Sequence, residues 1–134
     1  MKTRILFVED ERWGVAPYFH ELEKNGFKCV LARNGDEALN YLQNQKFDLI
    51  SIDIMFPPGE AFGKNIQPIK SGLKLLEMIR TGRIKNCSPD MTAIVLTAVM
   101  DEEIEAQIKN LNVTAYLKKP IDYEKVIENF RNLN

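Results

Sequence analysis

The stretch Asp48-Leu49-Ile50-Ser51-Ile52-Asp53 decides the fold, because it is a short apolar run that ends in a carboxylate. Its apolar residues are too few for a helix, and Pro57-Pro58-Gly59 breaks the chain soon afterwards. The pattern predicts a buried central strand that presents Asp53 at its carboxyl end. Such a carboxylate is a candidate nucleophile, although a strand-end Asp alone is more often a loop cap.

The composition is that of one ordinary globular domain. A chain of 134 residues, 45% hydrophobic and 28% charged, can bury a single core and has no bias toward disorder. Its net charge of -1 gives no general attraction for nucleic acid or for an anionic membrane. No apolar run approaches the ~20 residues of a membrane span. We therefore expect a cytoplasmic protein without direct nucleic-acid or membrane partners, with Cys29 and Cys87 as reduced thiols.

Strand and helix patterns alternate along the whole chain. Besides the central run, strands are expected at 5–8, 28–32, 92–97 and 114–117. Helices are expected at 15–25, 34–44, 71–80 and 101–111, and a last one carries Val126, Ile127, Phe130 and Leu133 to the C-terminus. Five short, mostly continuous apolar strands joined by helices indicate an α/β fold whose doubly wound parallel sheet is covered on both faces.

Three residues are expected to mark helix starts. Pro17 is placed in a first turn, where no intrahelical donor is lost. Asn34 is expected to cap the next helix, with Glu37 three residues on as in a capping box. Ser71 is expected to cap the third helix.

Polar side chains follow or end four of the expected strands. Glu9 and Asp10 follow the first strand, Asp53 ends the third, Thr97 ends the fourth and Lys119 follows the fifth. Right-handed crossovers place the carboxyl ends of all parallel strands on one edge of the sheet, where ligands of open sheets bind. The fold is therefore expected to gather these five residues.

The charges of this group limit its chemistry. Three carboxylates brought together repel one another unless a divalent cation lies among them. Oxygen ligands without His or Cys favour a hard ion such as Mg²⁺. A carboxylate can attack phosphorus when a metal and a cation neutralise the transferring group, and Lys119 and Thr97 supply an ammonium and a hydroxyl. The residues thus predict Mg²⁺-dependent phosphoryl acceptance on Asp53.

The chain resembles the CheY-like receiver domain of two-component response regulators over essentially its whole length. The resemblance rests on five motifs in order, Val8-Glu9-Asp10-Glu11, 48–57, Gly72-Leu73, Leu96-Thr97-Ala98 and Tyr116-Leu117-Lys118-Lys119-Pro120. It implies a flavodoxin-like (βα)5 fold with strand order 2-1-3-4-5. It also implies that a sensor histidine kinase or a phosphotransfer protein donates a phosphoryl group to Asp53.

The resemblance also implies a metal site. By position, Asp10 and Asp53 would bind Mg²⁺ directly, Glu9 would act through water, and the Met55 carbonyl would complete the protein ligands. Glu9 stands where many receivers have Asp, so a changed metal geometry is expected.

The remaining roles concern the phosphoryl group and the signal. Thr97 and Lys119 would hold the acyl phosphate, and Tyr116 matches the aromatic switch position. The fourth helix, fifth strand and fifth helix would form a surface for a downstream protein. We expect residues 1–134 to be a single receiver domain with no output domain, which catalyses only its own phosphorylation and dephosphorylation.

The connection 54–70 departs from the family pattern. Its seventeen residues exceed the ~2–6 that usually join a strand to a helix in such folds. Its Pro and Gly residues predict an irregular excursion, and we expect it to fold over the rim of the site and slow access by large partners.

Three alternatives remain open at this point. A hydrolase of the haloacid-dehalogenase kind needs a second acid two residues after its nucleophile, where this chain has Met55. A flavodoxin-like cofactor binder needs a phosphate loop after the first strand, where this chain has the acids 9–11. A degenerate receiver would serve only as a protein-docking module, and the long connection is the feature that favours it.

Overall fold

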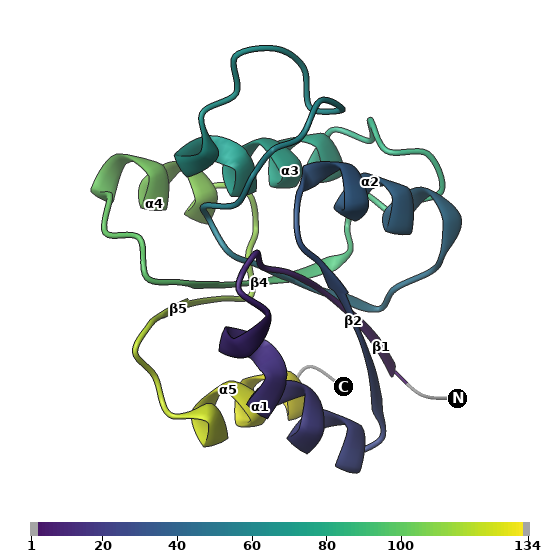
Figure 1. Cartoon of the computed structure of the whole chain (residues 1–134), viewed down its shortest axis with the longest axis vertical. Coiled ribbons are helices and arrows are strands. Elements are labelled where there is room, and N and C mark those ends of the chain that lie inside the picture. Colours follow the sequence, from purple (N-terminus) through teal and green to yellow (C-terminus); the bar gives the residue numbers. More distant parts are fainter. Residues whose placement is uncertain (1–2, 133–134) are drawn as a thin grey trace.

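The structure is a computed structural model that describes residues 3–132, apart from the side chains of Arg12, Trp13 and Tyr123. Five strands form one parallel sheet in the order β2-β1-β3-β4-β5, as the resemblance predicts (Figure 1). The strands are β1 (Thr3–Val8), β2 (Phe27–Ala32), β3 (Leu49–Ile52), β4 (Thr92–Thr97) and β5 (Ala115–Lys118). The helices are α1 (Arg12–Lys24), α2 (Gly35–Asn44), α3 (Ser71–Arg80), α4 (Glu102–Lys109) and α5 (Tyr123–Arg131), with a short 3-10 helix, η1 (Pro68–Lys70), before α3.

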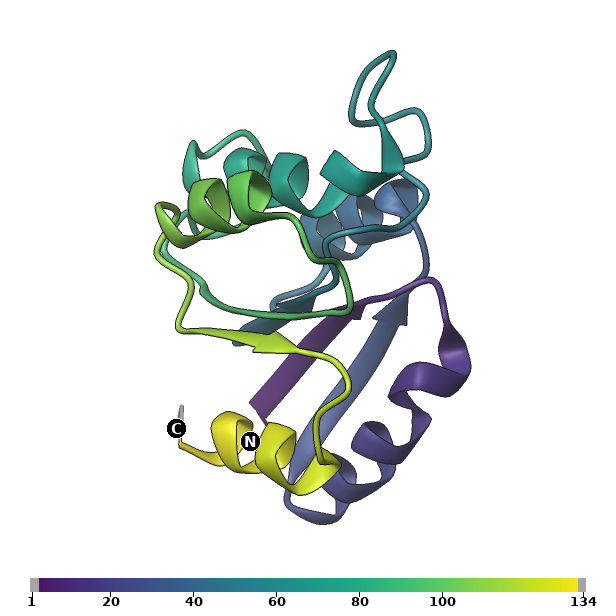
Figure 2. The same cartoon turned by 90° about the vertical axis from the view of Figure 1, so that its left-hand side faces the viewer.

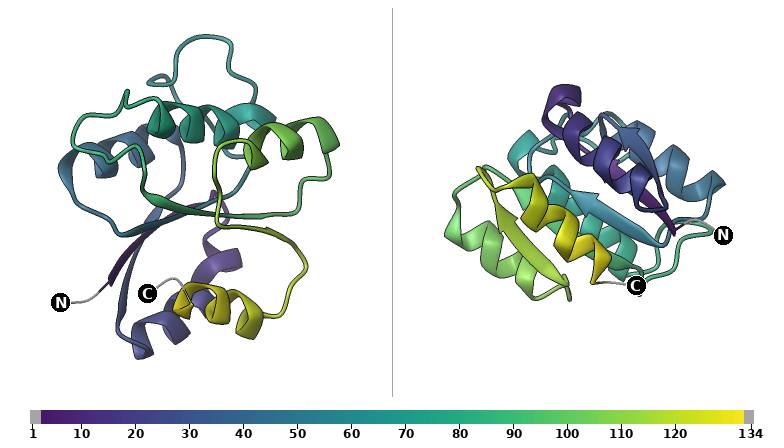
Figure 3. Two further views of the ribbon diagram at one scale, coloured as in Figure 1. Left: turned by 180° about the vertical axis from the view of Figure 1, so that it is seen from behind. Right: turned by 90° about the horizontal axis from the view of Figure 1, so that it is seen from below.

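The helices form a layer on each face of the sheet. Figure 2 shows α2, α3 and α4 on one face and α1 and α5 on the other, and Figure 3 shows α1 beside α5. Residues of β3 alternate between the two cores, with Ile50 and Ile52 under the first layer and Leu49 under the second. Because β3 lies between β1 and β4 and is buried on both faces, its end is held firmly.

Two helix starts differ from the sequence prediction, and one agrees with it. Helix α1 begins at Arg12, so Pro17 lies well inside it and not in its first turn. Ser71 does not cap α3, because η1 leads straight into that helix and the Ser71 N–H already bonds the Pro68 carbonyl. Asn34 does cap α2, since its side chain accepts the Glu37 N–H at 2.8 Å. The expected place of Leu133 in the last helix lies outside the described residues.

The long connection after β3 is fixed to the start of α2 through residues 57–61. The Asp36 carboxylate accepts the N–H groups of Glu60 and Ala61, with a shortest distance of 2.8 Å. Phe62 is buried in the core. Gly35 donates its N–H to Pro57, and a Cβ on Gly35 would lie 2.0 Å from the Pro58 carbonyl oxygen. The connection is irregular, as predicted, but it has a defined place.

Arg80 joins the segments that precede β4 and β5. Its guanidinium donates hydrogen bonds of 2.7–3.1 Å to backbone carbonyls, those of Pro89, Met91, Leu111 and Asn112. The pKa of Arg80 is lowered by burial, although the nearby Asp90 opposes this shift. Arg80 thus links the two segments by hydrogen bonds at the amino edge of the sheet, the edge where β4 and β5 begin.

Across residues 3–132, every helix is too short or too polar to span a lipid bilayer.

Candidate functional site

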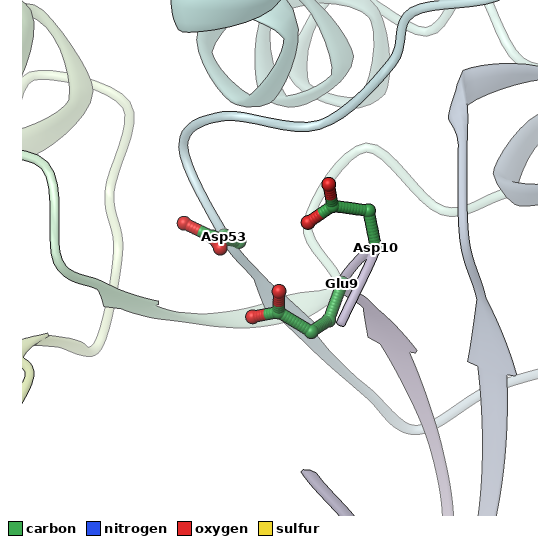
Figure 4. Close-up of side chains that lie close together, drawn as sticks. All are labelled: Glu9, Asp10 and Asp53. Atoms are coloured by element: carbon green, nitrogen blue, oxygen red, sulfur yellow. The ribbon is translucent and has the colours of Figure 1, made fainter. Parts of the chain in front are cut away.

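Three carboxylates meet where β1 and β3 end. Glu9 and Asp10 follow β1, Asp53 follows β3, and one oxygen of each lies within 4.8 Å of the others. Figure 4 shows the three side chains around a common space between the two strand ends. Backbone bonds hold this geometry, because the Asp53 N–H bonds the Val8 carbonyl at 3.0 Å and the Glu9 N–H bonds that of Ala32 at 2.9 Å. The acids that the sequence placed on one edge do lie together.

Thr97 fixes the orientation of Asp53. Its hydroxyl, at the end of β4, donates a 2.7 Å hydrogen bond to Asp53 Oδ1. The same hydroxyl oxygen accepts the Val99 N–H at 3.1 Å. Thr97 is completely buried, so this hydroxyl has no water to compete for its proton. The Asp53 carboxylate is therefore held in one orientation.

Lys119 extends into the same space from the end of β5, but it pairs with Glu9. Its ammonium lies 2.7 Å from Glu9 Oε2 and 4.0 Å from Asp53 Oδ2. The backbone places it there, because the Lys119 N–H bonds the Thr97 carbonyl at 2.8 Å. The Glu9–Lys119 pair was not anticipated from the sequence. The signal for it was Glu at position 9, whose extra methylene group lengthens its reach.

Burial and charge strongly perturb this pair. Burial raises the pKa of Glu9 to about 7, and the charge of Asp53 adds to this effect while the hydrogen bond from Lys119 opposes it. Burial alone would lower the pKa of Lys119, but its hydrogen bond to Glu9 and the charges of Glu9 and Asp53 raise it above the ordinary value. A further cation near Glu9 would favour its ionised form. The crowded oxygen donors thus fit a hard divalent ion.

The three acids open into a pocket of about 390 Å³. The other lining residues are Glu11, Met55, Ala98, Val99 and Lys119. From the whole 54–70 connection, Met55 is the residue that reaches this lining, with 47% of its surface exposed. The expectation that the connection folds over the site is therefore wrong. Its anchors on Asp36 and in the core hold it against α2 instead.

Tyr116, the expected switch residue, packs inward from β5. Its ring contacts the core beneath α2, α3 and α4, and the Lys109 ammonium lies 5.4 Å from the ring centroid. The hydroxyl is buried and has no hydrogen-bond partner within residues 3–132. Burial raises the pKa of Tyr116 to about 12, and the charge of Glu105 contributes to this shift.

Comparison with known proteins identifies the same kind of domain. A family model described as "Response regulator receiver domain" matches residues 5–131. Response regulator MprA of Mycobacterium sp. (strain KMS) is 29% identical over 135 residues, which cover 99% of this chain and 51% of that protein. The phosphate regulon transcriptional regulatory protein PhoB of Klebsiella pneumoniae is 30% identical over 127 residues, which cover 95% of this chain and 49% of that protein. The chain thus spans about half the length of these relatives.

A solved structure agrees with this assignment. A CheY-like response regulator receiver domain protein from Methanospirillum hungatei JF-1 has a TM-score of 0.80 and 25% identity, with 99% of this chain and 94% of that chain covered. The family match extends from residue 5, within β1, to the end of α5 at Arg131. The chain therefore belongs to the response regulator receiver domain family.

Proposed function

We propose that Asp53 accepts a phosphoryl group from the phosphohistidine of a sensor histidine kinase or a phosphotransfer protein. The observation that carries this proposal is the 2.7 Å hydrogen bond from Thr97 to Asp53 Oδ1 beside the Glu9–Asp10–Asp53 cluster. This arrangement fixes a nucleophilic carboxylate at an open pocket. The chain is then a phosphoacceptor signalling domain, which catalyses only its own phosphorylation and dephosphorylation.

The transfer makes one bond and breaks one. A carboxylate oxygen of Asp53 attacks phosphorus, the bond from phosphorus to the donor imidazole nitrogen breaks, and its electron pair stays on that nitrogen. Thr97 limits rotation of the carboxylate, so little orientation is lost on the way to the transition state. The Lys119 ammonium, 4.0 Å from Asp53 Oδ2, is close enough to balance charge on the phosphoryl oxygens.

Mg²⁺ is the proposed cofactor. Asp10 and Asp53 would hold it directly, Glu9 through water and Met55 through its backbone carbonyl. When bound, Mg²⁺ neutralises charge on the carboxylates and on the transferring phosphoryl group. The three acids suit this role because they offer only oxygen ligands at close range.

The output of phosphorylation is proposed to pass through α4, β5 and α5. An acyl phosphate adds roughly two negative charges beside Thr97 and Lys119. The Thr97 hydroxyl already donates to Asp53, so phosphorylation would move that donation to a phosphoryl oxygen. Tyr116 lies on β5 with the ammonium of Lys109, from α4, over its ring, and a change in its packing would alter the surface offered to a downstream protein.

Intact mass measurement tests the proposal. The wild-type chain, incubated with phosphoramidate or acetyl phosphate, is expected to gain the mass of one phosphoryl group with Mg²⁺ and none with a chelator. Asp53→Ala should gain nothing. Asp48→Ala is the matched control, because Asp48 precedes the same strand at the opposite edge of the sheet.

Two outcomes would contradict the proposal. Equal mass gain in wild type and Asp53→Ala would show that another residue is labelled. A folded wild-type chain that gains no mass from either donor would favour the alternative, a degenerate receiver that serves only as a protein-docking module.

A further inference from the structure

A groove of about 480 Å³ lies between α1 and β2, away from the acidic pocket. Three buried or half-buried apolar side chains form its floor and three exposed polar ones its rim, namely Val15, Phe19 and Leu31, and His20, Glu23 and Arg33. The Phe7 ring, with its centroid 4.9 Å from that of Phe19, supports the floor from inside the core. An apolar floor with a few polar groups around it is typical of ligand-binding sites.

The two charges of the rim lie toward opposite ends of the groove. Because β1 and β2 are parallel, α1 returns from the carboxyl edge of the sheet to the amino edge alongside β2 (Figure 2). Arg33 follows β2 at the carboxyl edge, near the level of Val15, whereas Glu23 lies about 12 Å further along the helix axis from Val15. Burial raises the pKa of Cys29, in the middle of β2, to about 12, and the charge of Glu23 adds to this effect. The Glu23 carboxylate is therefore near enough to act on β2.

Both charges are free to meet a ligand. Among the residues that the structure describes, none forms a hydrogen bond or an ion pair with the Glu23 carboxylate or the Arg33 guanidinium. The groove thus offers a positive group at one end, a negative group at the other and apolar surface between them.

The sheet is open beside this groove. In the order β2-β1-β3-β4-β5, β2 is an end strand. The Ala32 carbonyl accepts the Glu9 N–H at the end of β1, so the backbone groups of Cys29 and Leu31, at alternate positions, face away from β1. An open strand edge of this kind can accept an extended peptide as a further strand. The Leu31 side chain is on the groove floor, so a peptide added here would place alternate side chains on that floor.

We propose that the groove binds a short apolar peptide with free termini, about three residues long, which adds to β2 as a parallel strand. Three extended residues span about 10 Å, which matches the length of the groove between its charged ends. In the parallel direction the peptide carboxylate meets Arg33 and its ammonium meets Glu23. The antiparallel direction would bring like charges together at both ends. The site is separate from Asp53 and adds a second binding function to the domain.

A titration with the tripeptide Val-Leu-Val tests the proposal, with the amide NMR shifts of residues 19–23 and 29–33 as the measure of binding. Arg33→Gln should raise the Kd of the free peptide by at least about fivefold. It should raise the Kd of the C-terminally amidated peptide, which lacks the carboxylate, by less than about twofold. Glu23→Gln should show the same contrast between the free peptide and its N-acetylated form. Lys28→Gln is the control for charge, because Lys28 is exposed on β2 and alternates to the other face of the sheet.

Three outcomes of the titration would overturn the proposal. A peptide blocked at both termini that binds as tightly as the free one would show that an internal segment of a partner protein is the better occupant. Equal effects of Arg33→Gln on the free and the amidated peptide would show that Arg33 acts only through the general field of the domain. The third outcome is the absence of saturable shifts up to about 10 mM peptide.

Hydrogen exchange on the wild-type chain covers the case in which a variant fails to fold. Saturating Val-Leu-Val should slow the exchange of the Cys29 and Leu31 amides, because these outward groups would donate to the added strand. Unchanged exchange of both amides at saturation would show that the peptide does not pair with β2, and it would overturn the proposal. None of these outcomes bears on the labelling of Asp53, so the two proposals stand or fall separately.

Discussion

At the amino edge of the sheet the Arg80 guanidinium donates to four backbone carbonyls, whereas at the carboxyl edge the Glu9 and Asp53 carboxylates lie close together with the Lys119 ammonium between them. Every contact of Arg80 joins a donor to an acceptor. The carboxyl edge instead buries Glu9 beside a like charge, and its burial, together with the charge of Asp53, raises the pKa of Glu9.

The contrast shows how the two edges divide stability and function. The amino edge has its hydrogen bonds satisfied, so a substitution there should lower stability and leave the chemistry intact. The carboxyl edge keeps repulsion between carboxylates that a bound cation can relieve, so a neutralising substitution there should raise stability while it weakens binding. Three substitutions test this division.

Arg80→Ala should cause the largest loss of stability. Four carbonyls lose their donor, two of them before β4 and two before β5, and we expect the free energy of unfolding to fall by about 2–4 kcal/mol. Urea unfolding measures this loss. Arg83→Ala is the matched control, because Arg83 follows the same helix and its side chain is exposed. It should cost less than about 0.5 kcal/mol.

Phosphoryl gain should stay complete in folded Arg80→Ala, because Arg80 is at the edge opposite Asp53. Two results would contradict the proposed division of stability and function between the edges. Arg80→Ala could have the same free energy of unfolding as the Arg83→Ala control, or it could remain folded and gain no phosphoryl group.

Glu9→Gln should act in the opposite direction. The pKa of Glu9 is higher in the folded chain, about 7 against 4.5, so the folded state binds this proton more tightly than the unfolded state does. The free energy of unfolding therefore falls as the pH rises from about 4.5 to 7, and the loss is complete above the folded pKa. A neutral Gln avoids this loss, and at pH ~8 we expect Glu9→Gln to be more stable than wild type by about 1–3 kcal/mol.

Urea unfolding at several pH values, with a chelator present throughout, measures this difference. The gap should close toward pH ~5, where Glu9 in the folded wild type is protonated and as neutral as Gln. A variant that is less stable than wild type at high pH would show that the Glu9–Lys119 bond outweighs the burial of charge.

The sequence predicted what depends on local pattern and missed what depends on distant contacts. The parallel sheet and the grouping of Glu9, Asp10 and Asp53 followed from apolar runs and from strand ends. The Asn34 cap followed from a local pattern of polar residues. Each of these predictions used neighbours in the sequence or a general rule of parallel folds.

The predictions that failed concern residues whose contacts lie far away in the sequence. Ser71 has the composition of a cap, but its hydroxyl donates to the Phe56 carbonyl at 2.8 Å, fifteen residues away. Asp36 resembles an ordinary first-turn acid, yet it holds the long connection through the N–H groups of Glu60 and Ala61. The length of the 54–70 connection is visible in the sequence, whereas the direction it takes depends on these tertiary contacts.

Tyr116→Phe should have the smallest effect, and it tests whether the switch residue belongs with the carboxyl edge. The Tyr116 hydroxyl is buried without a partner within residues 3–132, and an unpaired buried hydroxyl is unfavourable, so its removal should leave stability unchanged or raise it by up to about 1 kcal/mol. The Lys109 ammonium keeps its place over the ring, because Phe offers the same aromatic face. Spectroscopic titration should show that the ionisation with a pKa of about 12 disappears in the variant, whereas it persists in the control Tyr41→Phe. If Tyr116→Phe lowers the free energy of unfolding by more than about 1 kcal/mol, the hydroxyl has a favourable hydrogen-bond partner. Tyr116 would then resemble Arg80, whose donors have acceptors. A neutral or favourable result would mean that the ring alone holds the inward position, so that the unpaired hydroxyl lowers the cost of moving Tyr116 when Asp53 is phosphorylated.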